Sequence, residues 1–245
     1  MFPYLIKSDS FTIGSYGLML AVAYLVGRWF FLNTLEKSKP AISNTEVLII
    51  LLLVFGVLGA KLMFILKNPE KQSLLLSGTG FSSQGAILGA MIATYLFTYF
   101  HKAKLSQILD AAAPAAILAY AIARIGCFLS GDDCYGITTD LPWAMSFPQG
   151  IAPTSLHVHP VPLYEIAYSL VIFAILLKRQ NKNNIPYSQF FVLLGLWGAC
   201  RFLVEFVSSN PKIILTMSGS QFGALLMFLF AAIFFVRHRT TISKS

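Results

Sequence analysis

Long apolar runs alternate with short polar breaks along almost the whole of this 245-residue chain. A helix needs about 20 mostly apolar residues to cross the hydrocarbon core of a bilayer, and most of these runs approach or reach that length. The pattern therefore predicts an all-α, polytopic membrane protein with about seven transmembrane helices. The expected spans cover about residues 14–34, 46–66, 84–101, 108–130, 162–178, 187–207 and 219–237.

Composition supports the membrane prediction and excludes a soluble protein. Hydrophobic residues make up 56% of the chain and charged residues 11%, whereas soluble domains are about a quarter charged. The net charge of +8 comes from basic residues in short groups between the apolar runs. They do not form one basic face, so we expect no nucleic-acid partner. No repeat or second domain is visible, and residues 1–245 are expected to form a single membrane domain.

Orientation follows from the distribution of Lys and Arg, because positively charged loops stay in the cytoplasm. Eleven of the eighteen lie on one side of the expected spans and four on the other, and three lie within spans. This asymmetry places the N-terminus outside and the C-terminus in the cytoplasm, which an odd number of spans requires. The loop at about 131–161 has no Lys or Arg and is expected outside.

Five charged side chains fall in the outer halves of the expected spans: Lys61, Arg124, Glu165, Arg201 and Glu205. A charge at the centre of a membrane helix costs a few kcal/mol or more, so each one marks a candidate functional residue. With the orientation above, all five lie toward the outer ends of their spans, at similar depth. One interpretation is mutual neutralisation, of Arg201 by Glu205 four residues later and of Arg124 by Glu165.

The alternative interpretation is an anion site. Three cations against two carboxylates leave one positive charge over. Arginine suits phosphate because its planar guanidinium gives two parallel hydrogen bonds and remains charged when partly desolvated. A phospholipid headgroup is the most abundant anion at that depth.

Acidic residues and glycines mark the exit of the fourth span. Asp132 and Asp133 lie at the membrane surface, and Gly126, Gly131 and Gly136 recur at intervals of five. Glycines at such places allow a positive φ or a close approach of the backbone to a ligand. We therefore expect an irregular, functional turn there.

Other polar residues are weaker candidates. His159 precedes the fifth span at the outer interface, and Tyr16 lies near the outer end of the first, where aromatic residues often act as anchors. Cys127, Cys134 and Cys200 show neither metal-ligand spacing nor a disulfide pattern, and are interpreted as packing residues. No metal and no cofactor are expected.

Six short motifs occur in order along the chain. They are Tyr16-Gly17-Leu18-Met19, Gly59-Ala60-Lys61-Leu62, Ser82-Ser83-Gln84-Gly85, Arg124-Ile125-Gly126, His159-Pro160 with Leu163-Tyr164-Glu165, and Arg201-Phe202-Leu203-Val204-Glu205. With these motifs the chain resembles the prolipoprotein diacylglyceryl transferase family, nearly from end to end. The resemblance implies transfer of diacylglycerol from phosphatidylglycerol to the lipobox cysteine thiol of a prolipoprotein signal peptide, with loss of glycerol phosphate. This is the first step of bacterial lipoprotein maturation.

The resemblance also implies a place and a site. The place is the bacterial cytoplasmic (inner) membrane, where the chain would be multi-pass and meet membrane lipids, with its site facing the outer leaflet. The family's important residues correspond to Tyr16, Arg124, Gly136, Arg201 and Glu205, with Asp132 or Asp133 in place of a glutamate. The arginines would stabilise charge on the departing phosphate, and the glutamates would orient them. Glu165 and His159 are expected to help bind the substrate.

Three positions depart from the family pattern. Family members usually have a histidine at the position of Gln84, and that histidine is commonly taken as the base that activates the thiol. They usually have an asparagine at the position of Cys127. The segment at 131–136 is one residue longer. A glutamine cannot take up a proton at working pH. Three alternatives follow: Asp132, Asp133 or His159 serves as the base, the reaction needs no dedicated base, or the chain is an inactive lipid-binding relative. An anion transporter is less favoured, because the charges lie toward one face.

Overall fold

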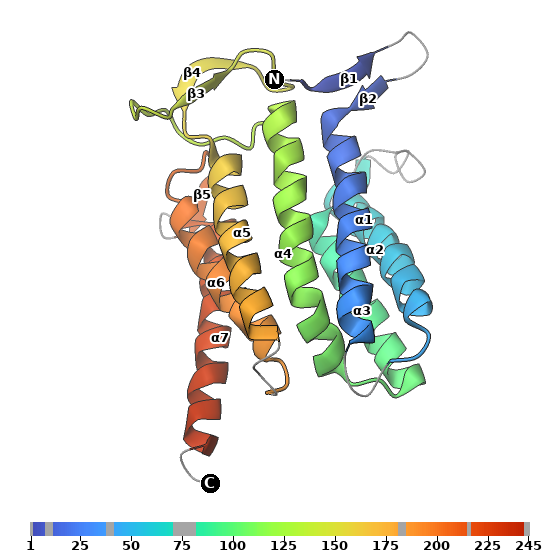
Figure 1. Ribbon diagram of the computed structural model, residues 1–245. Coiled ribbons are helices and arrows are strands. Elements are labelled where there is room, and N and C mark those ends of the chain that lie inside the picture. Colours follow the sequence, from blue (N-terminus) through green and yellow to red (C-terminus); the bar gives the residue numbers. More distant parts are fainter. Residues whose placement is uncertain are drawn as a thin grey trace. The chain divides into compact units, whose positions relative to one another are not determined.

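Seven helices and three short hairpins make up the computed structural model, which describes residues 2–7, 12–37, 42–70, 82–180, 185–214 and 217–242 (Figure 1). Within these residues the helices are α1 (Ser15–Glu36), α2 (Thr45–Lys67), α3 (Ser83–His101), α4 (Leu105–Ser130), α5 (Val161–Gln180), α6 (Ser188–Val204) and α7 (Gly219–Ile242). Each expected span coincides with one helix to within a few residues. The predicted positions of the helices are therefore confirmed.

Hydrophobicity and length identify this as a helical membrane protein. Five helices in the described ranges are long and apolar enough to cross a bilayer, namely α1, α2, α4, α5 and α7, whereas α6 and the apolar part of α3 are shorter. Large apolar side chains cover the outer faces of these helices. Trp29 on α1, Val171 on α5 and Phe230 on α7 are 60–64% exposed. Such surfaces are stable against lipid, because water would not solvate them.

The described chain divides into two compact units, 1–31 with 110–245, and 32–109. In the second unit, α2 and α3 pack through glycines. A Cβ atom on Gly59 would collide with the carbonyl oxygen of Gly85, and one on Gly89 with that of Phe55. The absent side chains let the two backbones approach closely, as small residues do between membrane helices.

In the first unit, α4, α5 and α6 share an apolar core. Ala113 and Ile117 of α4 meet Ile172 and Leu176 of α5, all at most 2% exposed, and Trp197 of α6 packs against them. The start of α6 is held by an acid from another helix. Asp110 accepts hydrogen bonds from the backbone N–H groups of Tyr187, at 2.8 Å, and Phe190, at 3.0 Å. These bonds satisfy amide groups that a helix N-terminus leaves unpaired.

Three antiparallel hairpins were not predicted by the all-α interpretation. They pair β1 (Tyr4–Lys7) with β2 (Thr12–Gly14), β3 (Met145–Phe147) with β4 (Thr154–Val158), and β5 (Lys212–Ile214) with β6 (Met217–Ser218). In the first unit, the first two hairpins lie at the end opposite the C-terminal end of α7 (Figure 1). Strands of two to five residues are too short for an apolar pattern to reveal.

Candidate active site

Two arginines and two glutamates from three helices form one ion-pair network. Arg124 of α4 places Nε 2.5 Å from Oε2 of Glu165, in the first turns of α5. Arg201 of α6 places Nη2 2.6 Å from Oε2 of Glu205, which follows α6 directly. Both predicted pairs are therefore confirmed. A third ion pair, between Nη1 of Arg201 and Oε1 of Glu165, joins the two pairs and was not predicted.

Burial distinguishes the members of this arginine–glutamate network. Glu165 is 0% and Glu205 2% exposed, whereas the side chains of Arg124 and Arg201 are 21% and 12% exposed. Two guanidinium groups face two carboxylates, so the network is neutral as a whole. The positive surplus expected from the sequence depended on Lys61, which lies on α2 in the other unit. Within the network, the carboxylates instead fix the positions of the arginines.

Tyr120 completes the surroundings of Arg124 and was missed by the sequence interpretation. Its hydroxyl donates a hydrogen bond of 3.0 Å to Oε1 of Glu165. The guanidinium carbon of Arg124 lies 4.9 Å from the centre of the Tyr120 ring, within cation–π range. The spacing of four residues places both side chains on one helix face. Apart from this spacing, a tyrosine within an apolar run gives no sign in the sequence of a role in the site.

Glu205 is held by the segment that leads into α7. Its Oε1 accepts hydrogen bonds from Nδ2 of Asn210, at 2.6 Å, and from Oγ of Ser218, at 2.7 Å. Ser218 also begins α7, because its Oγ accepts from the N–H of Gln221 while Oε1 of Gln221 accepts from the N–H of Ser218. This Ser-x-x-Gln capping box is a sequence signal that could have identified Ser218.

The chain folds back over the end of α4 just after Arg124. Gly131 has a φ of 58° and Asp133 a φ of 67°, which confirms the expected turn at Gly131. The turn brings Cys134 back to Cys127, and Nη1 of Arg124 lies 3.6 Å from Sγ of Cys127 and 3.7 Å from Sγ of Cys134. The pKa of Cys134 is raised, first because its thiol shares a hydrogen bond with Cys127 and also because it is partly buried.

The two acidic residues of this turn differ in surroundings. Oδ1 of Asp132 is buried and accepts no hydrogen bond within the described residues. It also lies within 4.8 Å of the sulfur atoms of Cys127 and Cys134. Asp133 is exposed and interacts with Tyr135. Asp132 is thus the acid that lies beside the two cysteine sulfur atoms.

Tyr16 of α1 approaches the same place. A Cβ atom on Gly126 would lie 2.9 Å from Cβ of Met19 and 3.4 Å from a ring carbon of Tyr16. Gly126 therefore lets α4 pack closely against α1, whereas the approach to a ligand expected there stays a prediction. Tyr16 is 39% exposed and lies in the electrostatic field of Arg124 and Asp132.

Gly136 and His159 lie beside the network without belonging to it. The N–H of Gly136 donates a 2.9 Å hydrogen bond to the carbonyl oxygen of His159. A Cβ atom at Gly136 would collide with the carbonyl oxygen of Val207, so the glycine lets two backbone segments of the chain approach closely. Nδ1 of His159 lies 3.1 Å from the hydroxyl oxygen of Tyr164, which also accepts a 2.7 Å hydrogen bond from Trp143.

Comparison with known proteins assigns this chain to a family. The family model described as prolipoprotein diacylglyceryl transferase matches residues 3–237. The chain belongs to this family. It is 31% identical to the phosphatidylglycerol–prolipoprotein diacylglyceryl transferase of Clostridium tetani over 92% of this chain and 93% of that one. It is 29% identical to the enzyme of that name from Dehalococcoides mccartyi, over 96% and 95% of the two chains. The enzyme of that name from Thermosynechococcus vestitus is 30% identical, over 79% and 76%.

Gln84 occupies the family's usual histidine position in the first turn of α3. Its side chain lies outside what the structure describes, and α3 belongs to the unit that contains residues 32–109. The prediction that Gln84 takes part in the site of this diacylglyceryl transferase family member therefore stays a prediction.

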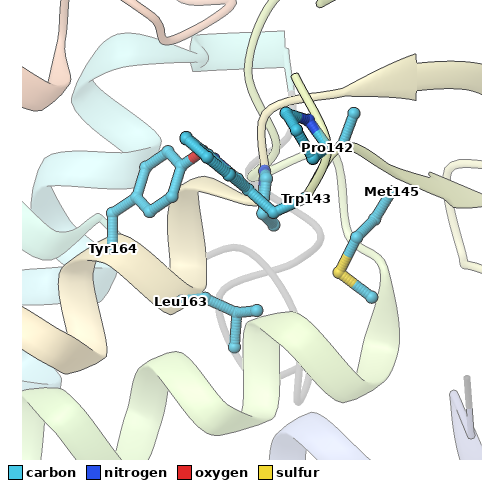
Figure 2. A pocket seen from close by; sticks show the side chains of 7 residues that line it. Pro142, Trp143, Met145, Leu163 and Tyr164 are labelled. Carbon is cyan, nitrogen blue, oxygen red and sulfur yellow. The ribbon is translucent and has the colours of Figure 1, made fainter. Parts of the chain in front are cut away.

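An open apolar hollow lies next to Tyr164 at the N-terminal end of α5. Its volume is about 720 Å³, and its lining includes Pro142, Trp143, Met145 and Leu163 (Figure 2). No member of the arginine–glutamate network lines it. In this diacylglyceryl transferase family member the hollow is thus an apolar surface beside the charged site, with the Trp143–Tyr164 hydrogen bond at its wall.

Proposed function

We propose that this chain transfers the diacylglyceryl group of phosphatidylglycerol to the lipobox cysteine thiol of a prolipoprotein. The sulfur atom attacks the glycerol carbon that carries the phosphodiester oxygen. A C–S bond forms, the C–O bond breaks, and glycerol phosphate leaves with the electron pair. The thiol proton is lost. Family membership and the geometry around Arg124 support this proposal.

The arrangement of Arg124 is the observation that carries the proposal. Glu165 and the ring of Tyr120 fix one side of its guanidinium. On another side, Nη1 lies 3.6 and 3.7 Å from the sulfur atoms of Cys127 and Cys134, its hydrogen-bond partners among the described residues. Sulfur is a weak acceptor. A phosphate oxygen is a much better partner, so Arg124 is held in place for an anion that its protein neighbours do not supply.

Catalysis follows from where the charge develops. As the C–O bond of the lipid breaks, negative charge grows on the departing phosphate oxygens. A guanidinium that is already oriented stabilises this charge without rearranging during the reaction. Arg201, between Glu165 and Glu205, supports the carboxylate that orients Arg124. Tyr16 and Asp132 lie close enough to contact the substrate, whereas His159 and Gly136 shape the backbone beside the site.

We propose that seven helices cross the membrane: the five long apolar ones together with α3 and α6. The positions of α3 and α6 at expected spans support this count, and the Lys and Arg asymmetry supports an external N-terminus. The whole chain would then form a single domain of the bacterial cytoplasmic membrane, with the segment at about 131–161 outside. The network, at the ends of α4 and α6 and the start of α5, would face phosphatidylglycerol of the outer leaflet.

Complementation tests the proposal. A bacterium depleted of its own diacylglyceryl transferase expresses this chain, and mass spectrometry measures thioether-linked diacylglycerol on a reporter lipoprotein. We expect lipidation by the unchanged chain and a fall of at least about 100-fold in initial rate for Arg124→Ala, as for removal of one donor from a site of developing charge. Lys178→Ala is the matched control, because Lys178 is an exposed cation at the end of α5 away from the network.

Two results would contradict the proposal. One is the absence of lipidation from a chain that is present in the membrane at normal amounts. The other is an equal loss of rate in the Arg124 and Lys178 variants. The first would favour a lipid-binding relative without the chemistry, and the second would remove Arg124 from the reaction.

A further inference from the structure

Cys127 and Cys134 are two thiols that take no part as reactants in the proposed transfer. Their sulfur atoms lie within 4.8 Å of each other, and the two thiols share a hydrogen bond. Cys127 is 7% exposed, Cys134 is half-buried, and both are free thiols in the structure. Two thiols in such contact are suited to oxidation to a disulfide.

The backbone brings the two thiols together. Positive φ angles at Gly131 and Asp133 reverse the chain after α4 and return it to the end of that helix. The loop between β3 and β4 then holds the turn, because the N–H of Ile151 donates a 2.9 Å hydrogen bond to the carbonyl oxygen of Ser130. The N–H of Ala152 donates a bond of the same length to the carbonyl oxygen of Gly131. The contact between the thiols is therefore built into the turn.

The distance between the sulfur atoms suits a disulfide. A disulfide joins sulfur atoms about 2.05 Å apart, so these two have to approach by less than about 3 Å. Rotation about the Cα–Cβ bonds of the two side chains covers such a distance while the backbone stays in place. Oxidation would thus add a covalent bond to a contact that the fold has already made.

The position of the pair in the chain favours oxidation. The turn leads into the segment at about 131–161, which the proposed membrane arrangement places outside the cytoplasm. Disulfides form and persist there, whereas cytoplasmic thiols are kept reduced. The chain has three cysteines, and the third, Cys200, packs on α6 against the apolar core. The pair can therefore form one disulfide, which leaves Cys200 as a thiol.

We propose that Cys127 and Cys134 form a disulfide that ties the turn after α4 to the end of that helix. The inference rests on the proposed function for the location of the turn outside the cytoplasm. The oxidant is an external disulfide, of the kind carried by thiol–disulfide oxidoreductases.

The reaction consists of two thiol–disulfide exchanges. The more exposed Cys134 loses its proton, and its sulfur attacks one sulfur atom of the oxidant, whose S–S bond breaks and whose other sulfur leaves as a thiol. Cys127 then loses its proton and attacks the sulfur of Cys134, and the remaining sulfur of the oxidant leaves as a second thiol. Two electrons and two protons pass to the oxidant. Hydrogen bonding to Cys127 and burial raise the pKa of Cys134, so the first exchange is slow at neutral pH.

Arg124 lies beside the pair. Its Nη1 is 3.6 Å from Sγ of Cys127 and 3.7 Å from Sγ of Cys134. In the second exchange its positive charge favours the Cys127 thiolate. Disulfide sulfur atoms carry no hydrogen, so they do not compete with the guanidinium as donors to a phosphate oxygen. The disulfide would therefore fix the turn beside Arg124 and leave the guanidinium available to the lipid.

Counting thiols tests the disulfide directly. The full chain is isolated in detergent without a reductant, its free thiols are alkylated under denaturing conditions, and its intact mass is measured before and after reduction with a phosphine. We expect one alkylated cysteine before reduction, Cys200, and all three afterwards. Three alkylated cysteines in the untreated chain, and again after incubation with oxidised glutathione, would refute the disulfide.

Thermal unfolding measures the effect of the bond. Reduction of the unchanged chain should lower the melting temperature by about 5–10 °C, because the bond closes a short loop. Cys127→Ser, Cys134→Ser and the double variant should no longer respond to the reductant. Cys200→Ser is the matched control and should respond as the unchanged chain does. Equal melting temperatures of the unreduced and reduced unchanged chain, or one response in all four variants, would contradict the proposal.

Transfer measured on the same preparations distinguishes failure of this inference from failure of the proposed function. The assay detects thioether-linked diacylglycerol formed from phosphatidylglycerol on a lipobox peptide. Transfer by a chain that keeps three thiols in oxidised glutathione would refute the disulfide and leave the transferase function intact. A disulfide between Cys127 and Cys134, with no transfer by the unreduced or the reduced chain, would refute the function and leave the disulfide intact.

Discussion

Glu165 is the centre of the arginine–glutamate network, and Glu165→Gln tests its energetics. The carboxylate is fully buried and accepts from Arg124, Arg201 and Tyr120. Glutamine keeps the size and one acceptor oxygen but removes the charge. Two guanidinium groups then face Glu205 alone, and one positive charge in the protein interior is left uncompensated.

The expected magnitude follows from that unpaired charge. Removing one partner of a buried ion pair costs about 3–5 kcal/mol. For a chain of this size each kcal/mol lowers the melting temperature by about 2–4 °C, so we expect a fall of about 6–20 °C. Thermal unfolding of the purified protein, followed by circular dichroism or by aggregation, measures it. Asp140→Asn is the control, since it removes one negative charge from an exposed position and should change stability by less than about 0.5 kcal/mol.

A double-mutant cycle gives the sharper result. Arg124→Gln alone leaves one excess negative charge, whereas Glu165→Gln with Arg124→Gln leaves the neutral pair of Arg201 and Glu205. The double variant should therefore be more stable than the sum of the two single losses predicts, by about 0.5–3 kcal/mol. Strict additivity, or a Glu165→Gln melting temperature equal to that of the unchanged chain, would refute the reasoning.

Two further changes test the surroundings of the network. Ser218→Ala removes both the 2.7 Å hydrogen bond to Glu205 and the cap of α7, so we expect a loss of about 2–3 kcal/mol in thermal unfolding; an equal loss in the exposed neighbour Ser220→Ala would contradict this. Gly136→Ala places a Cβ against the carbonyl oxygen of Val207 and should cost about 1–3 kcal/mol. Gly219→Ala meets no atom within 4 Å, and a similar loss there would count against the steric explanation.

Charges in apolar spans could be predicted from the sequence because they are costly and therefore conspicuous. The expected spans gave the depth of these charges, which suggested the pair Arg124–Glu165, and a spacing of four residues on one helix suggested the pair Arg201–Glu205. The link between Arg201 and Glu165 could not be predicted, because it depends on how α5 and α6 are rotated about their own axes. Apolar patterns in lipid carry little information about that rotation, since buried and lipid-facing residues are both hydrophobic.

Neutral polar partners were harder to predict than charges. Tyr120 and Asn210 are ordinary residues of an apolar run and a loop, and only three-dimensional proximity gives them a role. The cysteines were interpreted as packing residues because their spacing matches neither a metal site nor a disulfide scaffold. The contact between Cys127 and Cys134 needs the reversal at Gly131 and Asp133. The glycine at position 131 indicated a turn there. A positive φ at an aspartate such as Asp133 is too uncommon to predict from one sequence.

The two arginines that looked equivalent in the sequence have different tasks. Arg201 lies between two carboxylates, so moving it toward a ligand would break two strong ion pairs. Arg124 has one carboxylate, an aromatic ring and two sulfur atoms as neighbours, and turning its Nη1 edge to a phosphate loses only weak contacts. The more exposed arginine is therefore the one suited to bind the substrate. The two glutamates are buried and already paired with the arginines, so their role is to orient the guanidinium groups.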